Sequence, residues 1–163
     1  MVYRETRVTS ANKQEDNGQR GVSAGILARR DFQTLINVLQ DTGYAVIAPT
    51  LQENTIVYDQ ITRVDDLPEG WGDDQDGGHY RVENRKDGFL FSYAVGPRTW
   101  KKWLFPPRTE LWSARRTPQG FAVEEAELAA ERFAFLGVRS CELHAMGIQD
   151  RVFLQDKHHD KIY

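Results

Sequence analysis

The side chains with the clearest chemical potential are Cys141 and His144, which follow a short apolar run near the end of the chain. We expect Cys141 to lie in the first turn of a helix capped by Ser140. Unpaired backbone N–H groups, the positive end of the helix dipole and the neighbouring Arg139 would favour the thiolate, the form that binds metals and attacks electrophiles. The alternative is that Cys141 packs on the apolar face of its helix, since free cysteines are often buried.

His144 follows Cys141 by three residues, which places both on one side of the predicted helix. A cysteine–histidine pair can act as a nucleophile and its base. The sequence identifies neither an Asn or Asp to orient the histidine nor an oxyanion hole. We therefore interpret His144 first as a polar neighbour, and keep a small thiol enzyme as an alternative function.

A second block interleaves tryptophans and lysines and ends in two prolines. Trp100, Trp103 and Leu104 have the spacing of one apolar helical turn, which leaves the lysines outward. Basic and aromatic residues together can also hold single-stranded nucleic acid, but the helical spacing favours core packing or contact with a partner protein. The residues assigned to partner contact are Trp100, Lys101, Lys102 and Trp103.

The elements that position these blocks begin with a helix over 31–42. Asp31 is a suitable N-cap, apolar residues follow at helical spacing, and Gly43 can end the helix in a left-handed conformation. Tyr44–Pro49 then predicts a buried strand that the proline stops, and Thr55–Ile61 predicts its hairpin partner.

The middle of the chain predicts a polar loop and several short strands. Asp65–Gly78 is rich in acidic residues and glycine, as in a surface loop. The predicted strands are His79–Glu83, Phe89–Val95, Glu110–Arg115 and Gly120–Glu124, the last two joined by a turn at Thr117–Gly120.

The C-terminal part predicts one strand–helix unit over 133–154. Phe133–Val138 is an almost continuous apolar run, typical of a strand buried on both faces. The following helix would carry one apolar stripe, made up of Cys141, Ala145, Ile148 and Val152. The fold class is therefore α+β, with an N-terminal helix, a mixed, mostly antiparallel sheet and the C-terminal strand–helix unit.

We expect residues 1–22 to form a flexible leader and 23–163 a single α+β domain. The strand–helix unit lacks a second strand, which favours the front part of a longer chain. The N-terminus lacks the apolar core of a signal peptide and no apolar run reaches about 20 residues, so we expect a cytoplasmic protein without membrane insertion. A net charge of −3 gives no reason to expect nucleic acid.

Three segments together resemble the N-terminal region of the 4Fe-4S dicluster-domain family. This family includes the beta subunit of soluble sulfhydrogenase-type nickel–iron hydrogenases and the corresponding subunit of anaerobic sulfite reductase. The resemblance spans roughly residues 31–154. The segments are Asp74–Val82, Trp100–Pro107 and Gly137–Ala145, the last followed by Asp150–Phe153.

The resemblance implies an electron-transfer part of an oxidoreductase complex, itself non-catalytic, that docks flavin- or nicotinamide-binding and catalytic subunits. The family's third segment commonly reads Arg-Pro-Cys-Asp, whereas this chain has Arg139-Ser140-Cys141-Glu142. Cys141 is the one residue that carries over as a 4Fe-4S ligand. A cluster needs about four thiolates, so the others must come from outside this chain. The alternative is a stand-alone interaction module with no redox centre.

Overall fold

The computed structural model of the chain describes residues 2–3, 26–96, 98–126, 131–154, 159–160 and 163. Its strands are β1 (Val2–Tyr3), β2 (Tyr44–Gln52), β3 (Thr55–Gln60), β4 (Trp71–Asp76), β5 (His79–Asn84), β6 (Trp112–Thr117), β7 (Gly120–Glu125) and β8 (Arg132–Phe135). Its helices are α1 (Phe32–Asp41), α2 (Lys101–Leu104) and α3 (Ser140–Leu154), with 3₁₀ turns η1 (Arg29–Asp31) and η2 (Val64–Asp66). This arrangement is the predicted α+β class.

A four-stranded sheet in the order β1–β8–β2–β3 forms the centre of the molecule. β8 lies parallel to β2 and antiparallel to β1, while β2 and β3 form an antiparallel hairpin. Two further two-stranded sheets, β4–β5 and β6–β7, are separate hairpins. β3 and β8 both pair with β2, although β8 follows β3 in the sequence only after the two separate hairpins.

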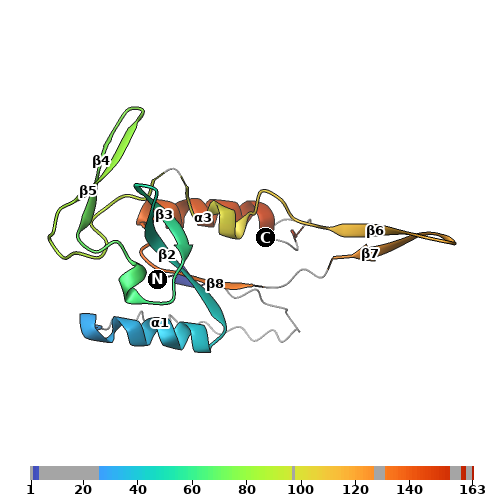
Figure 1. The fold of residues 1–163 in the computed structure, drawn as a ribbon, viewed down its shortest axis with the longest axis horizontal. Coiled ribbons are helices and arrows are strands. Elements are labelled where there is room, and N and C mark those ends of the chain that lie inside the picture. The colour runs from blue at the N-terminus through green and yellow to red at the C-terminus, as the bar shows by residue number, and fades with distance from the viewer. Residues whose placement is uncertain (1, 4–25, 97, 127–130, 155–158, 161–162) are drawn as a thin grey trace, which may run out of the picture.

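The central sheet is covered on both faces, with α1 on one side and α3 on the other (Figure 1). Val46 and Ala48 of β2 pack with Ile36 and Leu39 of α1. The intervening Ile47 packs with Phe135 on the opposite face, together with Trp100, Leu104 and Met146. The predicted strand buried on both faces is therefore confirmed as β8, although it ends at Phe135 and not, as predicted, at Val138.

The first predicted helix and hairpin are confirmed, but the proline does not stop the strand. β2 continues through Pro49 to Gln52, with Pro49 opposite Tyr58 of β3. Val46 O accepts a hydrogen bond from Ile61 on the β3 side, whereas Ile47 O accepts one from Leu136 on the β8 side. Backbone groups of successive residues point alternately to β3 and β8, so the Pro49 nitrogen faces β8. Because proline has no N–H to donate, the parallel pairing with β8 ends there, while the pairing with β3 continues.

Two predictions for the middle of the chain are wrong. Residues 71–76, predicted as loop, form β4, which pairs with β5 around the two-residue turn Gly77–Gly78. A Gly-Gly pair suits such a turn, and Gly78 has φ +73°. The Phe89–Val95 segment, predicted as a strand, forms none, because its backbone makes single hydrogen bonds to separate partners and no ladder with a neighbouring strand; examples are Gly70 N to Phe89 O at 2.8 Å and Tyr80 Oη to Ala94 O at 3.1 Å.

The hairpin predicted near residues 110–124 is confirmed as β6–β7, with Thr117 opposite Gly120. It extends away from the central sheet (Figure 1). Of the predicted leader, Val2–Tyr3 form β1, and the rest lies outside the described residues. No helix in the described part of the chain is long and apolar enough to cross a membrane.

Candidate functional site at the start of α3

The turn from β8 into α3 depends on Gly137. This residue has φ +70°, a conformation that side-chain-bearing residues rarely adopt. A Cβ atom there would lie 2.6 Å from Phe91 Cε1 and 3.3 Å from Pro49 Cδ. The chain therefore passes close to both rings and reaches the first turn of α3 within three residues.

The first turn of α3 is capped by Arg139 and Glu142 and not, as predicted, by Ser140. Leu143 N donates to Arg139 O at 3.0 Å, so Arg139 occupies the cap position and Ser140 is the first helical residue. The Glu142 carboxylate accepts a hydrogen bond from Arg139 N at 3.1 Å. This is the acidic half of a capping box, three residues after the cap.

Tyr58 of β3 anchors the same carboxylate from inside the core. Its hydroxyl lies 2.7 Å from Glu142 Oε2 and 3.4 Å from Gly137 O. The Tyr58 side chain is fully buried. Burial, and then the hydrogen bond to Glu142, raise the pKa of Tyr58 far above its ordinary value. The phenol therefore stays protonated and donates to Glu142.

Arg139 connects the start of α3 to the irregular segment before α2. Its guanidinium donates a hydrogen bond to Tyr93 O. Tyr93 is buried, and its hydroxyl donates to Leu90 O at 2.8 Å. Burial raises the pKa of Tyr93, partly opposed by the charge of Arg139.

Cys141 lies in this fixed first turn with its side chain exposed. The alternative in which it packs on an apolar face is wrong, and of the predicted apolar stripe only Ala145 packs against the core. Ile148 and Val152 are 44% and 62% exposed, and the face that packs inward carries Leu143, Met146 and Phe153. The helix is thus rotated so that its cysteine faces outward.

His144 is also exposed. Within the described residues, no hydrogen bond joins it to Cys141, and no group of three or more His, Cys, Asp or Glu side chains could hold a metal ion. The described side chains therefore offer a single accessible sulfur. That donor fits one position of a cluster completed by ligands from elsewhere, and does not fit a cluster held by this chain alone.

The tryptophan–lysine block belongs to the same core cluster as the inward face of α3, and its residues have different roles. Trp100 is 2% exposed and packs with Leu104, Phe135 and Met146, so it is a core residue and its assignment to partner contact is corrected. Trp103 is half-buried, and its indole N–H donates to Tyr58 O at 3.4 Å. The tight helical turn of α2 points these two indoles inward.

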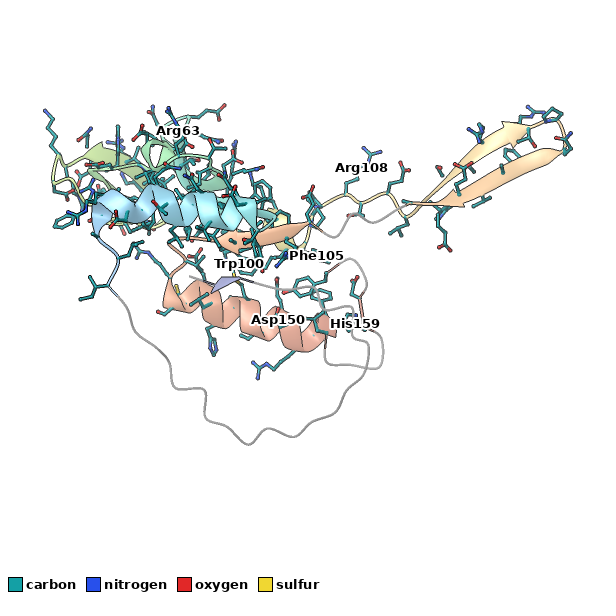
Figure 2. The ribbon with its side chains drawn as sticks, turned by 90° about the horizontal axis from the view of Figure 1, so that it is seen from below. Arg63, Trp100, Phe105, Arg108, Asp150 and His159 are labelled. Atoms are coloured by element: carbon teal, nitrogen blue, oxygen red, sulfur yellow. The ribbon has the colours of Figure 1, made fainter. Side chains whose placement is uncertain are left out.

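The two lysines of the block face outward. Lys101 is exposed, whereas Lys102 Nζ lies 3.7 Å from Asp59 Oδ1 and 4.8 Å from the centre of the Trp103 ring. Phe105, which is half exposed, stacks on Phe153 of α3 with ring centres 5.2 Å apart. Figure 2 labels Phe105 near the end of α3. Lys101, Lys102 and Phe105 therefore remain available at the surface next to α3.

The structure brings together two of the three segments singled out in the sequence. Trp100–Pro107 and Gly137–Ala145 share one core cluster, and Tyr58 contacts both. The Asp74–Val82 segment lies in the β4–β5 hairpin, which contacts β3 through the Tyr80 hydroxyl, 3.3 Å from Ile56 N. No described contact links that hairpin to Cys141.

Sequence reasoning missed Tyr58, Tyr93 and the anchoring role of Glu142. The acidic residue three positions after the cap was a signal for Glu142. Nothing in the spacing identifies Tyr58 or Tyr93, because both reach the site from strands and loops distant in the chain. Comparison of the chain with family models, curated proteins and solved structures found no match in any of the three.

Proposed function

We propose that this chain is the docking part of an iron–sulfur electron-transfer subunit in a cytoplasmic hydrogenase or sulfite reductase complex. It is non-catalytic, and Cys141 donates one thiolate to a 4Fe-4S cluster whose other ligands come from outside this chain. Flavin- or nicotinamide-binding and catalytic subunits are its partners. The resemblance of the three segments motivates the proposal.

The observation that carries the proposal is the position of Cys141. Its sulfur is exposed, yet the turn that holds it is fixed by Glu142, the Tyr58 hydroxyl and Gly137. A ligand to a shared cluster must be accessible to the rest of the cluster and must also be held in place by its surroundings. Neighbouring N–H groups at the start of α3 can donate to cluster sulfur, which tunes the reduction potential.

Two alternatives make different predictions. A thiol enzyme needs a base within hydrogen-bond reach of the sulfur, and among the described residues His144 makes no such bond to Cys141. A stand-alone interaction module needs no thiol at all, so it predicts that replacing Cys141 leaves binding unchanged.

Transfer of a thiolate-ligated synthetic 4Fe-4S cluster tests the proposal. Under anaerobic conditions we expect the Cys141 thiolate to replace one thiolate of the synthetic cluster, which leaves as free thiolate, while the other three stay bound to iron. Visible absorbance should then co-elute with the intact chain and not with C141S. The matched control C141S/S113C moves the thiol to the exposed β6–β7 hairpin. Equal uptake by this control would mean that exposure alone explains the result, and would overturn the role given to the start of α3.

A further inference from the structure

The β6–β7 hairpin has two different faces. Residues directly opposite each other in an antiparallel pair lie on the same face, and successive residues alternate. The register therefore places one set of side chains together, which we call the aromatic face: Trp112, Ala114, Arg116, Phe121, Val123 and Glu125. The polar face carries Ser113, Arg115, Thr117, Gly120, Ala122 and Glu124, with Arg115 Nη2 2.9 Å from Glu124 Oε1.

No described part of the chain covers the aromatic face. Trp112, Phe121 and Val123 are 61%, 74% and 64% exposed. The hairpin projects from the body of the molecule, beyond the segment that carries Arg108 (Figure 2). A two-stranded hairpin is marginally stable alone in water, and a large exposed apolar face usually marks an interface. A packed layer over this face would stabilise the hairpin.

The charges on the aromatic face are complementary to a second copy of the same face. Arg116 lies in the row nearest the turn, opposite Phe121, and Glu125 lies in the row nearest the base, opposite Trp112. Two hairpins packed face to face and running in opposite directions place the Arg116 row of one copy over the Glu125 row of the other. A twofold axis over the central pair, Ala114 and Val123, makes both contacts at once.

We propose that the aromatic face is the interface of a homodimer in which two β6–β7 hairpins pack antiparallel, face to face. Each Arg116 pairs with Glu125 of the second copy, and Trp112 and Phe121 of both copies fill the space between the hairpins. The two strands together carry two arginines and two glutamates, so they lack the excess of basic charge that nucleic-acid binding requires. The proposal is independent of Cys141.

The aromatic face is small for a protein–protein interface, which favours a weak dimer. The two aromatic rings and Val123 expose on the order of 400 Å² per copy. With Ala114, Arg116 and Glu125 added, two copies bury about 1,000 Å², the lower limit of a specific interface. We therefore expect a reversible dimer with a micromolar dissociation constant.

Sedimentation of the full chain in reducing buffer, from about 1 µM to about 1 mM, tests the association. We expect a monomer–dimer equilibrium. F121E should raise the dissociation constant at least about 100-fold, since each dimer loses two buried rings, while A122E on the polar face should change it less than about threefold. The proposal would be overturned if the chain stayed monomeric at all concentrations. It would also be overturned if both variants had equal effects, which is the result expected for pairing through strand edges.

The charge pairing has its own test. R116E alone and E125R alone should each weaken self-association about 10-fold, because each homodimer then places like charges opposite each other. A mixture of the two variants should form heterodimers with near-original affinity, since each heterodimer has one original Arg116–Glu125 pair and one pair with the charges reversed. No preference for the heterodimer in the mixture would contradict the antiparallel arrangement, and circular dichroism of each variant checks that the hairpin is kept.

Discussion

Replacing Gly137 by alanine should destabilise the fold because the turn into α3 has no room for a Cβ atom. The left-handed backbone at φ +70° costs an L-residue about 1–2 kcal/mol. The new methyl would lie 2.6 Å from Phe91 Cε1, so that ring must move. Phe91 packs edge-on against Phe32 with ring centres 6.3 Å apart, a contact worth about 1 kcal/mol. We expect the free energy of unfolding to fall by about 2–3 kcal/mol.

Thermal and urea unfolding monitored by circular dichroism measure this loss. For a chain of this length it corresponds to a fall in Tm of about 4 to 12 °C. The matched control is G147A, ten residues further along, where a Cβ meets nothing within 4 Å and the backbone is helical. That change should raise stability by about 1 kcal/mol, through helix propensity. Equal stabilities of G137A and the unmodified chain would refute the argument that the β8–α3 turn is sterically fixed.

Three further perturbations test the surroundings of the site. A double-mutant cycle of Y58F and E142Q should give a coupling of about 1–2 kcal/mol in urea unfolding, and additive effects would mean that the 2.7 Å hydrogen bond does not anchor α3. Burial raises the pKa of Tyr58 and Tyr93 in the folded chain, so on raising the pH the unfolded chain loses these two protons first. The free energy of unfolding should therefore be constant below a pH of about 10 and fall above it, by up to about 1.4 kcal/mol per pH unit for each tyrosine. Y58F should lose less stability between pH 9 and 11 than the unmodified chain, and parallel curves would contradict this assignment. W100A should lower the free energy of unfolding by about 3–5 kcal/mol and K101A by less than about 0.5 kcal/mol. Similar small losses for both variants would contradict the assignment of Trp100 to the core.

Much of the central fold followed from periodicity in the sequence. The stripe before Gly43 and the apolar run around Phe135 identified α1 and β8 because burial on one or two faces leaves a direct pattern. β4 (Trp71–Asp76) was missed because it has no alternating apolar pattern: half of its residues are aspartates and its last three residues are exposed, which leaves the turn at Gly77–Gly78 as the main signal. The predicted end of the strand at Pro49 was wrong because the effect of a proline depends on which neighbouring strand its nitrogen faces, and the sequence alone does not specify this.

The candidate site was predictable only near Cys141. Its place in the first turn of a helix followed from the strand–turn–helix pattern, but the rotation of α3 did not. Cys141, Ile148 and Val152 have helical spacing, yet Met146 and Phe153 are the residues that pack inward, because Trp100 and Phe105 supply aromatic partners on that side. Tyr58 and Tyr93 reach the site through tertiary contacts that leave no local pattern.

The central claim is that Cys141 ligates a cluster shared with other polypeptide. The most direct measurement is the iron and acid-labile sulfide content of the native assembly, purified anaerobically through a tag on this chain, alongside the same assembly carrying C141S. We expect iron and sulfide in about equal amounts in the first, and in the second a loss of iron or an altered electron paramagnetic resonance signal after reduction. An assembly that contains partner proteins but neither iron nor sulfide, or a cluster unaffected by C141S, would contradict the account.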